Sequence, residues 1–120
     1  MGTVKTHRDL QIWQKSMDLV TIIYDETDLF PNSEKFGLRS QIRRASVSVP
    51  ANIAEGFGRR SNGDFKRFLN ISMGSLFELQ TEIEIAKNLG ILNESKFEEL
   101  YDYTREVERM MSSFIRTLQS

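Results

Sequence analysis

Residues 97–118 place apolar or small side chains at spacings that alternate between three and four residues. The positions are Phe97, Leu100, Thr104, Val107, Met111, Phe114 and Leu118. This alternation sets all of these side chains along one side of an α-helix and is typical of the seam of a left-handed helical bundle. A long amphipathic helix depends on packing for its stability. The pattern therefore predicts that the rest of the chain supplies helices that cover this side.

Three further segments show the helical period. Residues 10–29 carry a main apolar stripe and a second line beside it: Trp13, Met17, Val20 and Tyr24, then Ile12, Leu19 and Ile23. Residues 34–57 carry one stripe: Leu38, Ile42, Ala45, Val49 and Ile53. Residues 62–89 carry another: Phe65, Leu69, Leu76, Leu79, Ile83 and Ala86. Pro50 lies inside the second pattern and removes one backbone hydrogen bond there, so we expect a kink without a break.

Polar residues and glycine mark the ends of these helices. The candidate caps and stops are, in chain order, Asn32 or Ser33, Ser61 or Asn62, Gly90 and Asn93. The connections are short, and short connections make neighbouring helices antiparallel. We predict an all-α fold, an antiparallel up-down-up-down four-helix bundle. It forms a single domain over residues 1–120, with residues 1–8 as a flexible N-terminal tail.

The residues that most enzymes and metal sites use are scarce. The chain has no cysteine and one histidine, His7, which argues against thiolate ligands and histidine-based acid–base pairs. It has neither the Glu-x-x-His motif of di-iron bundles nor a Walker-type phosphate loop. We expect no catalytic residue, no cofactor and no metal. We also expect a cytoplasmic protein without membrane contact, because no apolar run approaches the ~20 residues of a membrane span and no signal-peptide pattern opens the chain.

The charge of the chain is unevenly distributed. The net charge is -1, yet residues 34–67 hold eight Lys or Arg against three Asp or Glu, a net of +5. A basic segment suggests an anionic partner such as RNA or DNA. The alternative is that these bases face the acidic segments of the chain itself.

An antiparallel turn near Ser61 pairs the second and third helices in a defined register. In this register Arg43 faces Glu78, and Arg39 faces Glu82. The other expected neighbours are Ser48 with Gly74 at a close backbone approach, Asn52 with Asn70, and Glu55 with Lys66 and Arg67. The remaining bases gather near the turn. Contact with nucleic acid is expected to centre on Arg59 and Arg60, with Arg44, Lys66 and Arg67 in support.

Some apolar residues lie off the main stripes. These are Phe68, Ile71 and Phe77 in the third helix, and Tyr103, Met110 and Ile115 in the fourth. A helix of a monomeric bundle shows one apolar face, and large exposed apolar patches mark interaction surfaces. The second apolar lines therefore predict a homo-oligomer.

Residues 51–59 read Ala-Asn-Ile-Ala-Glu-Gly-Phe-Gly-Arg, a segment that resembles the four helix bundle protein family. This family is also known as the intervening-sequence protein family of large-subunit ribosomal RNA genes. Further motifs support the resemblance, in order: Leu10-x-x-Trp13-Gln14-Lys15, Gly37-Leu38-x-x-Gln41-Ile42-Arg43-Arg44-Ala45, Ser46-Val47-Ser48-Val49-Pro50 and Gly74-Ser75-Leu76-x-Glu78-Leu79. The match spans about residues 8–118.

The resemblance implies ring-shaped homopentamers of four-helix bundles with no settled biochemical activity and no catalytic residues. Six residues match the family signature and are expected to be structural: Asn52, Glu55, Gly56, Gly74, Ser75 and Glu78. A related branch, the accessory variability determinant of diversity-generating retroelements, is a basic pentamer that binds nucleic acid and a reverse transcriptase. This chain departs from that branch in being slightly acidic.

Two functions follow as hypotheses. The first is a non-enzymatic homo-oligomeric scaffold, a pentamer by resemblance, whose partner is another copy of itself. The alternative is an accessory protein that binds RNA or DNA weakly and without sequence preference, through the basic patch at the turn between the second and third helices.

Overall fold

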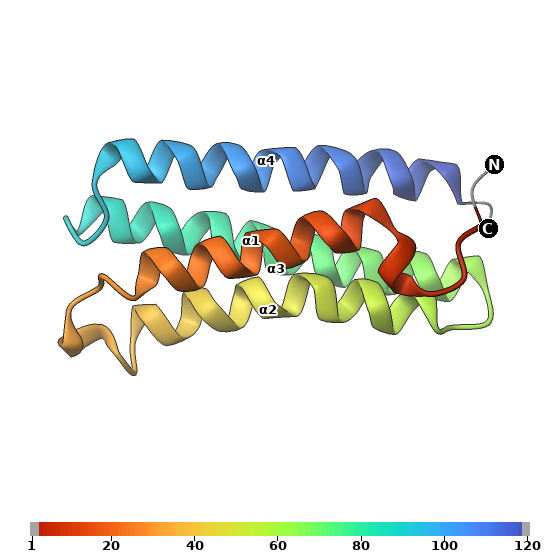
Figure 1. The fold of residues 1–120 in the computed structure, drawn as a ribbon, viewed down its shortest axis with the longest axis horizontal. Helices are drawn as coiled ribbons and strands as arrows, with labels where there is room; N and C mark the ends of the chain where they lie inside the picture. Colours follow the sequence, from red (N-terminus) through yellow and green to blue (C-terminus); the bar gives the residue numbers. More distant parts are fainter. Residues whose placement is uncertain (1–2, 119–120) are drawn as a thin grey trace.

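The computed structural model describes residues 3–118, which form four α-helices, two short 3-10 helices and no β-strand (Figure 1). In chain order they are η1 (His7–Asp9), α1 (Gln11–Thr27), η2 (Asn32–Glu34), α2 (Leu38–Phe57), α3 (Asn62–Asn88) and α4 (Glu94–Thr117). The molecule measures 45 Å along the helices and 24 by 20 Å across them. The predicted all-α class is confirmed.

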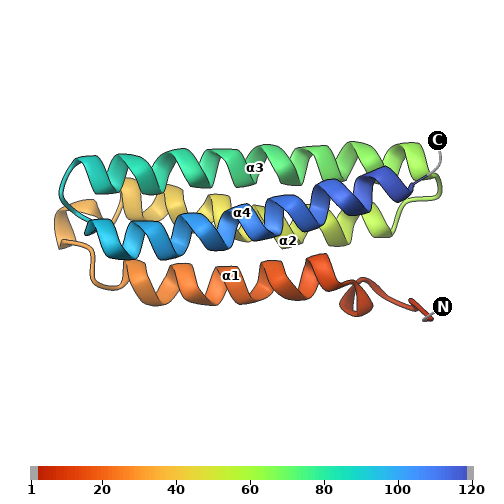
Figure 2. The ribbon, with the colours of Figure 1, turned by 90° about the horizontal axis from the view of Figure 1, so that it is seen from above.

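Each α-helix runs in the opposite direction to the one before it, as the colours of Figure 1 show. Seen from above, α1 and α3 lie on opposite sides of the bundle, with α4 in front of α2 between them (Figure 2). Two hydrogen bonds set the pairing of α2 with α3. The Ser48 and Ser75 hydroxyl oxygens lie 2.8 Å apart, and the Ser72 hydroxyl donates to the Val49 carbonyl at 2.8 Å. The later α2 residue meets the earlier α3 residue, as in an antiparallel pair centred near Ser61.

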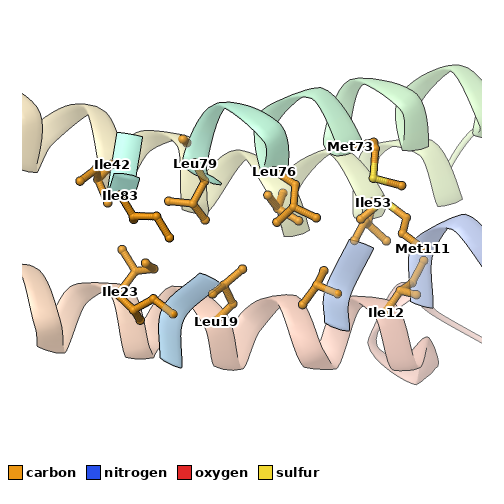
Figure 3. Close-up of a cluster of buried hydrophobic side chains, with 14 of the residues drawn as sticks. Ile12, Leu19, Ile23, Ile42, Ile53, Met73, Leu76, Leu79, Ile83 and Met111 are labelled. Atoms are coloured by element: carbon orange, nitrogen blue, oxygen red, sulfur yellow. The ribbon is translucent and has the colours of Figure 1, made fainter. Parts of the chain in front are cut away.

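The core lies along the bundle axis and receives apolar side chains from all four helices (Figure 3). Its fully buried members include Leu19, Ile23, Ile42, Val49, Ile53, Leu69, Leu76, Leu79, Ile83, Val107 and Met111. Burying one side chain of this size stabilises the fold by about 1.5–3 kcal/mol relative to leaving it in water. The stripes predicted for the second, third and fourth helices supply most of these residues.

The stripe predicted as the main one in α1 is wrong. Met17 and Tyr24 are exposed, whereas Ile12, Leu19 and Ile23 of the second line are buried. The buried side of α1 also includes Ser16 and Thr27, so two of its positions are polar in the sequence. Their hydroxyls keep a hydrogen bond although they are buried, because each donates to the backbone carbonyl four residues earlier, at 2.7 Å.

Three of the predicted helix ends are confirmed. The Ser61 hydroxyl accepts from the Asp64 amide at 3.1 Å, and the Asn93 side chain accepts from the Lys96 amide at 2.7 Å. Gly90 ends α3 with a φ of 77°, in the left-handed region that favours glycine.

The predicted start of α2 is wrong by four residues. Asn32 and Ser33 belong to η2, and α2 begins at Leu38. The carboxylate of Glu34 caps the helix instead, because its Oε1 accepts from the Leu38 amide at 3.0 Å. Pro50 lies inside α2, which continues through it from Leu38 to Phe57.

The N-terminal segment that is predicted as a flexible tail includes the short helix η1. Thr6 and Asp9 form a capping box around η1, and the ring of His7 packs edge-on against Trp13 at 5.1 Å. The flexibility of the tail itself stays a prediction. Residues 1 and 2 of that expected tail lie outside the described residues.

Candidate functional site

The turn between α2 and α3 carries four of the five predicted nucleic-acid contacts. Arg59 pairs with Glu55 at 2.8 Å, and Arg67 pairs with Asp64 at 3.1 Å. Both guanidinium groups lie over the ring of Phe68, at 4.6 and 4.5 Å from its centre. Glu55 thus pairs within its own helix and Arg67 pairs with Asp64, so the expected contact of Glu55 with Arg67 is wrong. The expected contact of Glu55 with Lys66 stays a prediction.

The other two bases at the turn differ in their surroundings. Arg60 is exposed and forms no ion pair with any residue of the described range 3–118. Lys66 is half-buried and interacts within the chain. The turn therefore brings together Arg59, Arg60, Lys66 and Arg67, although its two paired arginines are partly neutralised.

Arg44 does not lie at this turn, so its predicted place is wrong. It lies near the start of α2, about 22 Å along the helix from Arg59 at 1.5 Å per residue. There it lines a groove of about 460 Å³ between α2 and α3. The groove is lined by Gln41, Arg44, Ala45, Ser48, Glu78 and Glu82.

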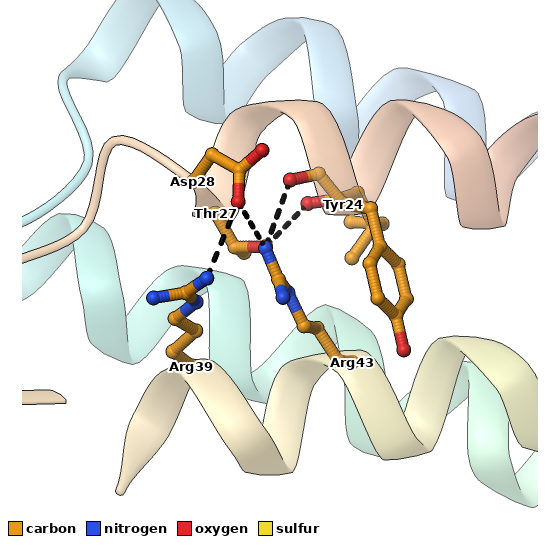
Figure 4. A network of polar contacts seen from close by, with 6 residues as sticks. Tyr24, Thr27, Asp28, Arg39 and Arg43 are labelled. Atoms are coloured by element: carbon orange, nitrogen blue, oxygen red, sulfur yellow. Dashed lines mark hydrogen bonds and ion pairs between the residues drawn. The ribbon is translucent and has the colours of Figure 1, made fainter. Parts of the chain in front are cut away.

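The predicted ion pairs of Arg43 with Glu78 and of Arg39 with Glu82 are also wrong. Both arginines turn to α1 and share one carboxylate oxygen of Asp28, at 2.8 Å from Arg43 and 3.2 Å from Arg39 (Figure 4). The predicted register is close to the observed one, but successive helical residues differ by about 100° in direction. Arg44, one residue further on, faces the acidic side of α3 instead.

Glu82 is a buried carboxyl group without a hydrogen-bond partner at its Oε1 among the described residues. Its side chain lies in the α2–α3 groove, and the residue is 8% exposed. Burial, with a smaller contribution from the neighbouring Glu78 carboxylate, raises the pKa of Glu82 to about 7. Near neutral pH this group therefore changes its charge, unlike an ordinary glutamate.

Of the signature residues, Ser75 and Gly56 join α2 to α3, whereas Asn52 binds within α2. Asn52 donates to the Ser48 carbonyl and hydroxyl at 2.8 and 2.9 Å, so the predicted pair with Asn70 is wrong. The Ser48 hydroxyl meets Ser75. A Cβ on Gly56 would lie 2.8 Å from the Cβ of Phe68, so only glycine permits this approach.

Gly74 has no such role among residues 3–118. A Cβ at this position would meet nothing within 4 Å, so the expected close approach of Ser48 to Gly74 is wrong. Gly74 lies instead on an exposed side of α3 that also carries Ile71 and Ile85. Glu78, another residue of the family signature, is exposed and lines the α2–α3 groove next to this side of α3.

The six apolar residues that lie off the main stripes of α3 and α4 differ in their exposure. Tyr103, Met110 and Ile115 are half-buried and pack against the core, so the expected second surface on α4 is wrong. Phe68 is also half-buried, and the guanidinium groups of Arg59 and Arg67 lie over its ring. Ile71 and Phe77 remain 43% and 47% exposed on α3.

Two other kinds of site, a metal centre and a membrane-spanning helix, are absent from residues 3–118. No group of three or more His, Cys, Asp or Glu side chains in this range could hold a metal ion. No helix of the described range is long and apolar enough to cross a membrane. A hollow of about 670 Å³ between the N-terminal end of α1, the segment before it and α4 has a mixed lining, in which Leu10, Met110 and Phe114 are apolar and Asp9 and Arg109 are charged.

Comparison with known proteins identifies a family and a solved structure with a similar fold. The family model described as 23S rRNA-intervening sequence protein matches residues 8–113. No curated protein matches this chain. A crystal structure of a protein of unknown function from the S23 ribosomal protein family of Bacteroides thetaiotaomicron superposes with a TM-score of 0.81. It is 24% identical, and the alignment covers 88% of this chain and 95% of that one. At this identity the likeness shows the shared fold.

Proposed function

The chain belongs to the 23S rRNA-intervening sequence protein family, and we propose that it works as a non-enzymatic, homo-oligomeric helical scaffold. The assembly that the resemblance to this family implies is a pentamer. The partner of each subunit is then another copy of the same chain, and the functional surface is a face of the bundle rather than a pocket.

The outer side of α3 carries this proposal. Ile71, Gly74, Glu78 and Ile85 recur at helical spacings, with Phe77 beside them, and the three apolar members are between 42% and 47% exposed. Glycine inside a helix costs about 1 kcal/mol relative to alanine. No described residue requires a glycine at position 74. A neighbouring subunit that approaches the backbone of α3 would explain why position 74 is a glycine. The same subunit would cover the exposed isoleucines.

Light scattering coupled to size exclusion tests the proposal. A pentamer has five times the chain mass of 13.9 kDa, about 70 kDa. The double variant Ile71→Glu with Ile85→Glu should reduce this mass while circular dichroism keeps its helical signal. Val47→Glu is the matched control, because Val47 is 42% exposed on α2. A wild-type mass near 14 kDa at micromolar concentration would refute the scaffold.

A second candidate function is sequence-independent binding of RNA or DNA at the α2–α3 turn. Arg60, which forms no ion pair with the described residues, and the Arg59–Phe68–Arg67 stack favour it. Phosphate contacts weaken steeply with salt because they release counterions.

Anisotropy of labelled single-stranded RNA, measured against salt, tests this second function. Arg59→Ala with Arg60→Ala should reduce both the affinity and the salt slope, whereas Lys87→Ala, near the opposite end of α3 from the turn, should change neither. If the wild type fails to bind at ~50 mM salt, where phosphate contacts are strong, the turn is not a nucleic-acid interface.

A further inference from the structure

A second basic surface lies at the opposite end of α2 from the turn, about 30 Å away at 1.5 Å per residue. Here the end of α1 and the start of α2 enclose a hollow of about 300 Å³, which we name the α2 entry pocket. Its lining combines four cations, two aromatic rings and one hydroxyl: Lys35, Arg39, Arg43 and Arg44, Tyr24 and Phe36, and Ser40. We propose that this pocket binds a nucleoside phosphate, either free or as one unit of a single strand. The proposal is independent of the scaffold and of the candidate site at the turn.

The charge of the pocket is only partly neutralised within the chain. Asp28 pairs with both Arg39 and Arg43 through the same oxygen, so one carboxylate serves two guanidinium groups. Lys35 and Arg44 form no ion pair with any residue between 3 and 118. The lining therefore retains an excess of positive charge, which a bound anion would neutralise.

One of the arginines is held in place before any ligand arrives. Arg43 donates through Nε to the Thr27 hydroxyl at 2.8 Å and through Nη2 to the Tyr24 carbonyl at 3.1 Å (Figure 4). Its guanidinium also stacks on the Tyr24 ring at 4.3 Å. These contacts use Nε and Nη2 and leave the Nη1 edge for a further acceptor. A fixed guanidinium loses little freedom on binding, and its planar fork matches a phosphate.

The more exposed of the two aromatic residues in the site is Phe36. Its side chain is 89% exposed, although burial is the usual place for a phenylalanine. The Lys35 ammonium lies 5.5 Å from the ring centre, so a positive charge and a free ring face are adjacent. Proteins that bind single-stranded nucleic acids pair cations for the backbone with rings on which bases stack. The combination favours a phosphate that carries an aromatic base over a simple anion.

The test compares three probes on the full chain at ~50 mM salt, where phosphate contacts are strong. The probes are adenosine monophosphate, inorganic phosphate and a ten-nucleotide single-stranded RNA, measured by calorimetry and by anisotropy. The wild type should bind the mononucleotide or the RNA more tightly than inorganic phosphate. Binding of the mononucleotide identifies a free nucleotide as the ligand, and binding of the RNA alone identifies a strand.

Variants at exposed positions assign the binding to this pocket without disturbing the core. Phe36→Ala should weaken binding about fivefold or more, since a stacked base is lost. Lys35→Ala should reduce the salt slope for RNA by about one. Leu29→Ala, which removes another exposed apolar side chain at this end of the bundle, and Arg116→Ala are the matched controls and should bind as the wild type does.

Three results would overturn the assignment. The first is a wild type that binds neither the mononucleotide nor the RNA. The second is binding that Phe36→Ala and Lys35→Ala leave unchanged, including binding that only Arg59→Ala with Arg60→Ala removes. The third is inorganic phosphate bound as tightly as the mononucleotide, which would make the pocket an anion site without a base.

Discussion

Replacing Glu82 by glutamine should remove a pH-dependent loss of stability from the bundle. In the folded chain Glu82 is 8% exposed, and its Oε1 has no hydrogen-bond partner among the described residues. Burial and then the Glu78 carboxylate raise its pKa from 4.5 to about 7. The groups that face it are Glu78 on its own helix and Gln41, Arg44 and Ser48 on α2.

The sign and size of the effect follow from proton linkage. Between the two pKa values the folded protein keeps a proton that the unfolded chain has released, so the free energy of unfolding falls as the pH rises. The loss is absent well below pH 4.5 and complete above pH 7. From pH 5 to pH 8 it amounts to about 2.5 kcal/mol on the order-of-magnitude scale of such shifts.

Urea unfolding at pH 5 and pH 8, at one protein concentration, measures this difference. The wild type should lose about 2.5 kcal/mol more than Glu82→Gln over this interval. Glu84→Gln, an exposed position two residues away, should behave as the wild type. The same comparison of Glu82 with Glu82→Gln in an Arg44→Ala background removes the cation of the groove, with which the Glu82 carboxylate could otherwise pair. If wild type and Glu82→Gln show the same pH dependence in both backgrounds, Glu82 is not a buried, unpaired acid.

Three further substitutions test the packing and the helix ends by urea unfolding. Gly56→Ala should destabilise the fold by about 1–3 kcal/mol, because its Cβ would meet Phe68 at 2.8 Å; Gly63→Ala, with open space around it, is the control, and equal stabilities would contradict the close approach. Ser61→Ala should cost about 1 kcal/mol through loss of the bond to the Asp64 amide, and an unchanged midpoint would mean that the cap contributes nothing. Pro50→Ala should be neutral or mildly stabilising, since it restores a backbone donor in a continuous helix; a loss of several kcal/mol would show that the packing needs the proline ring.

The sequence predicted the number, order and direction of the helices because these depend on periodicity and on loop length. The α4 pattern is the clearest case, since Phe97, Leu100, Val107 and Met111 are all buried as expected. In α1 the same reasoning chose the wrong side. Ser16 and Thr27 are polar residues on the buried face, so they interrupt the apolar pattern in the sequence. Only the three-dimensional structure shows that their hydroxyls donate to backbone carbonyls.

The candidate sites were harder to predict because they depend on direction around a helix and not only on register. The expected register of α2 and α3 is close to the observed one, yet Arg43 points to α1 and Arg44 to the groove with Glu82. The α2 entry pocket joins Tyr24, Phe36 and Arg39 from two helices and a connection. Of these, the exposure of Phe36 is the signal that a sequence pattern does not contain, because phenylalanine is normally read as core.

The polar contacts between α2 and α3 have a consequence for the order in which the bundle folds. Residues 58–61 are all that separates these two helices, so bringing them together closes a short loop at a small cost in chain entropy. The contacts of α1 with α4, such as Lys15 with Glu106, join opposite ends of the chain and require a much longer closure. Local contacts form faster than distant ones. The α2–α3 hairpin should therefore assemble first, and the seam between α1 and α4 should be the last to close and the first to exchange its amide protons with solvent.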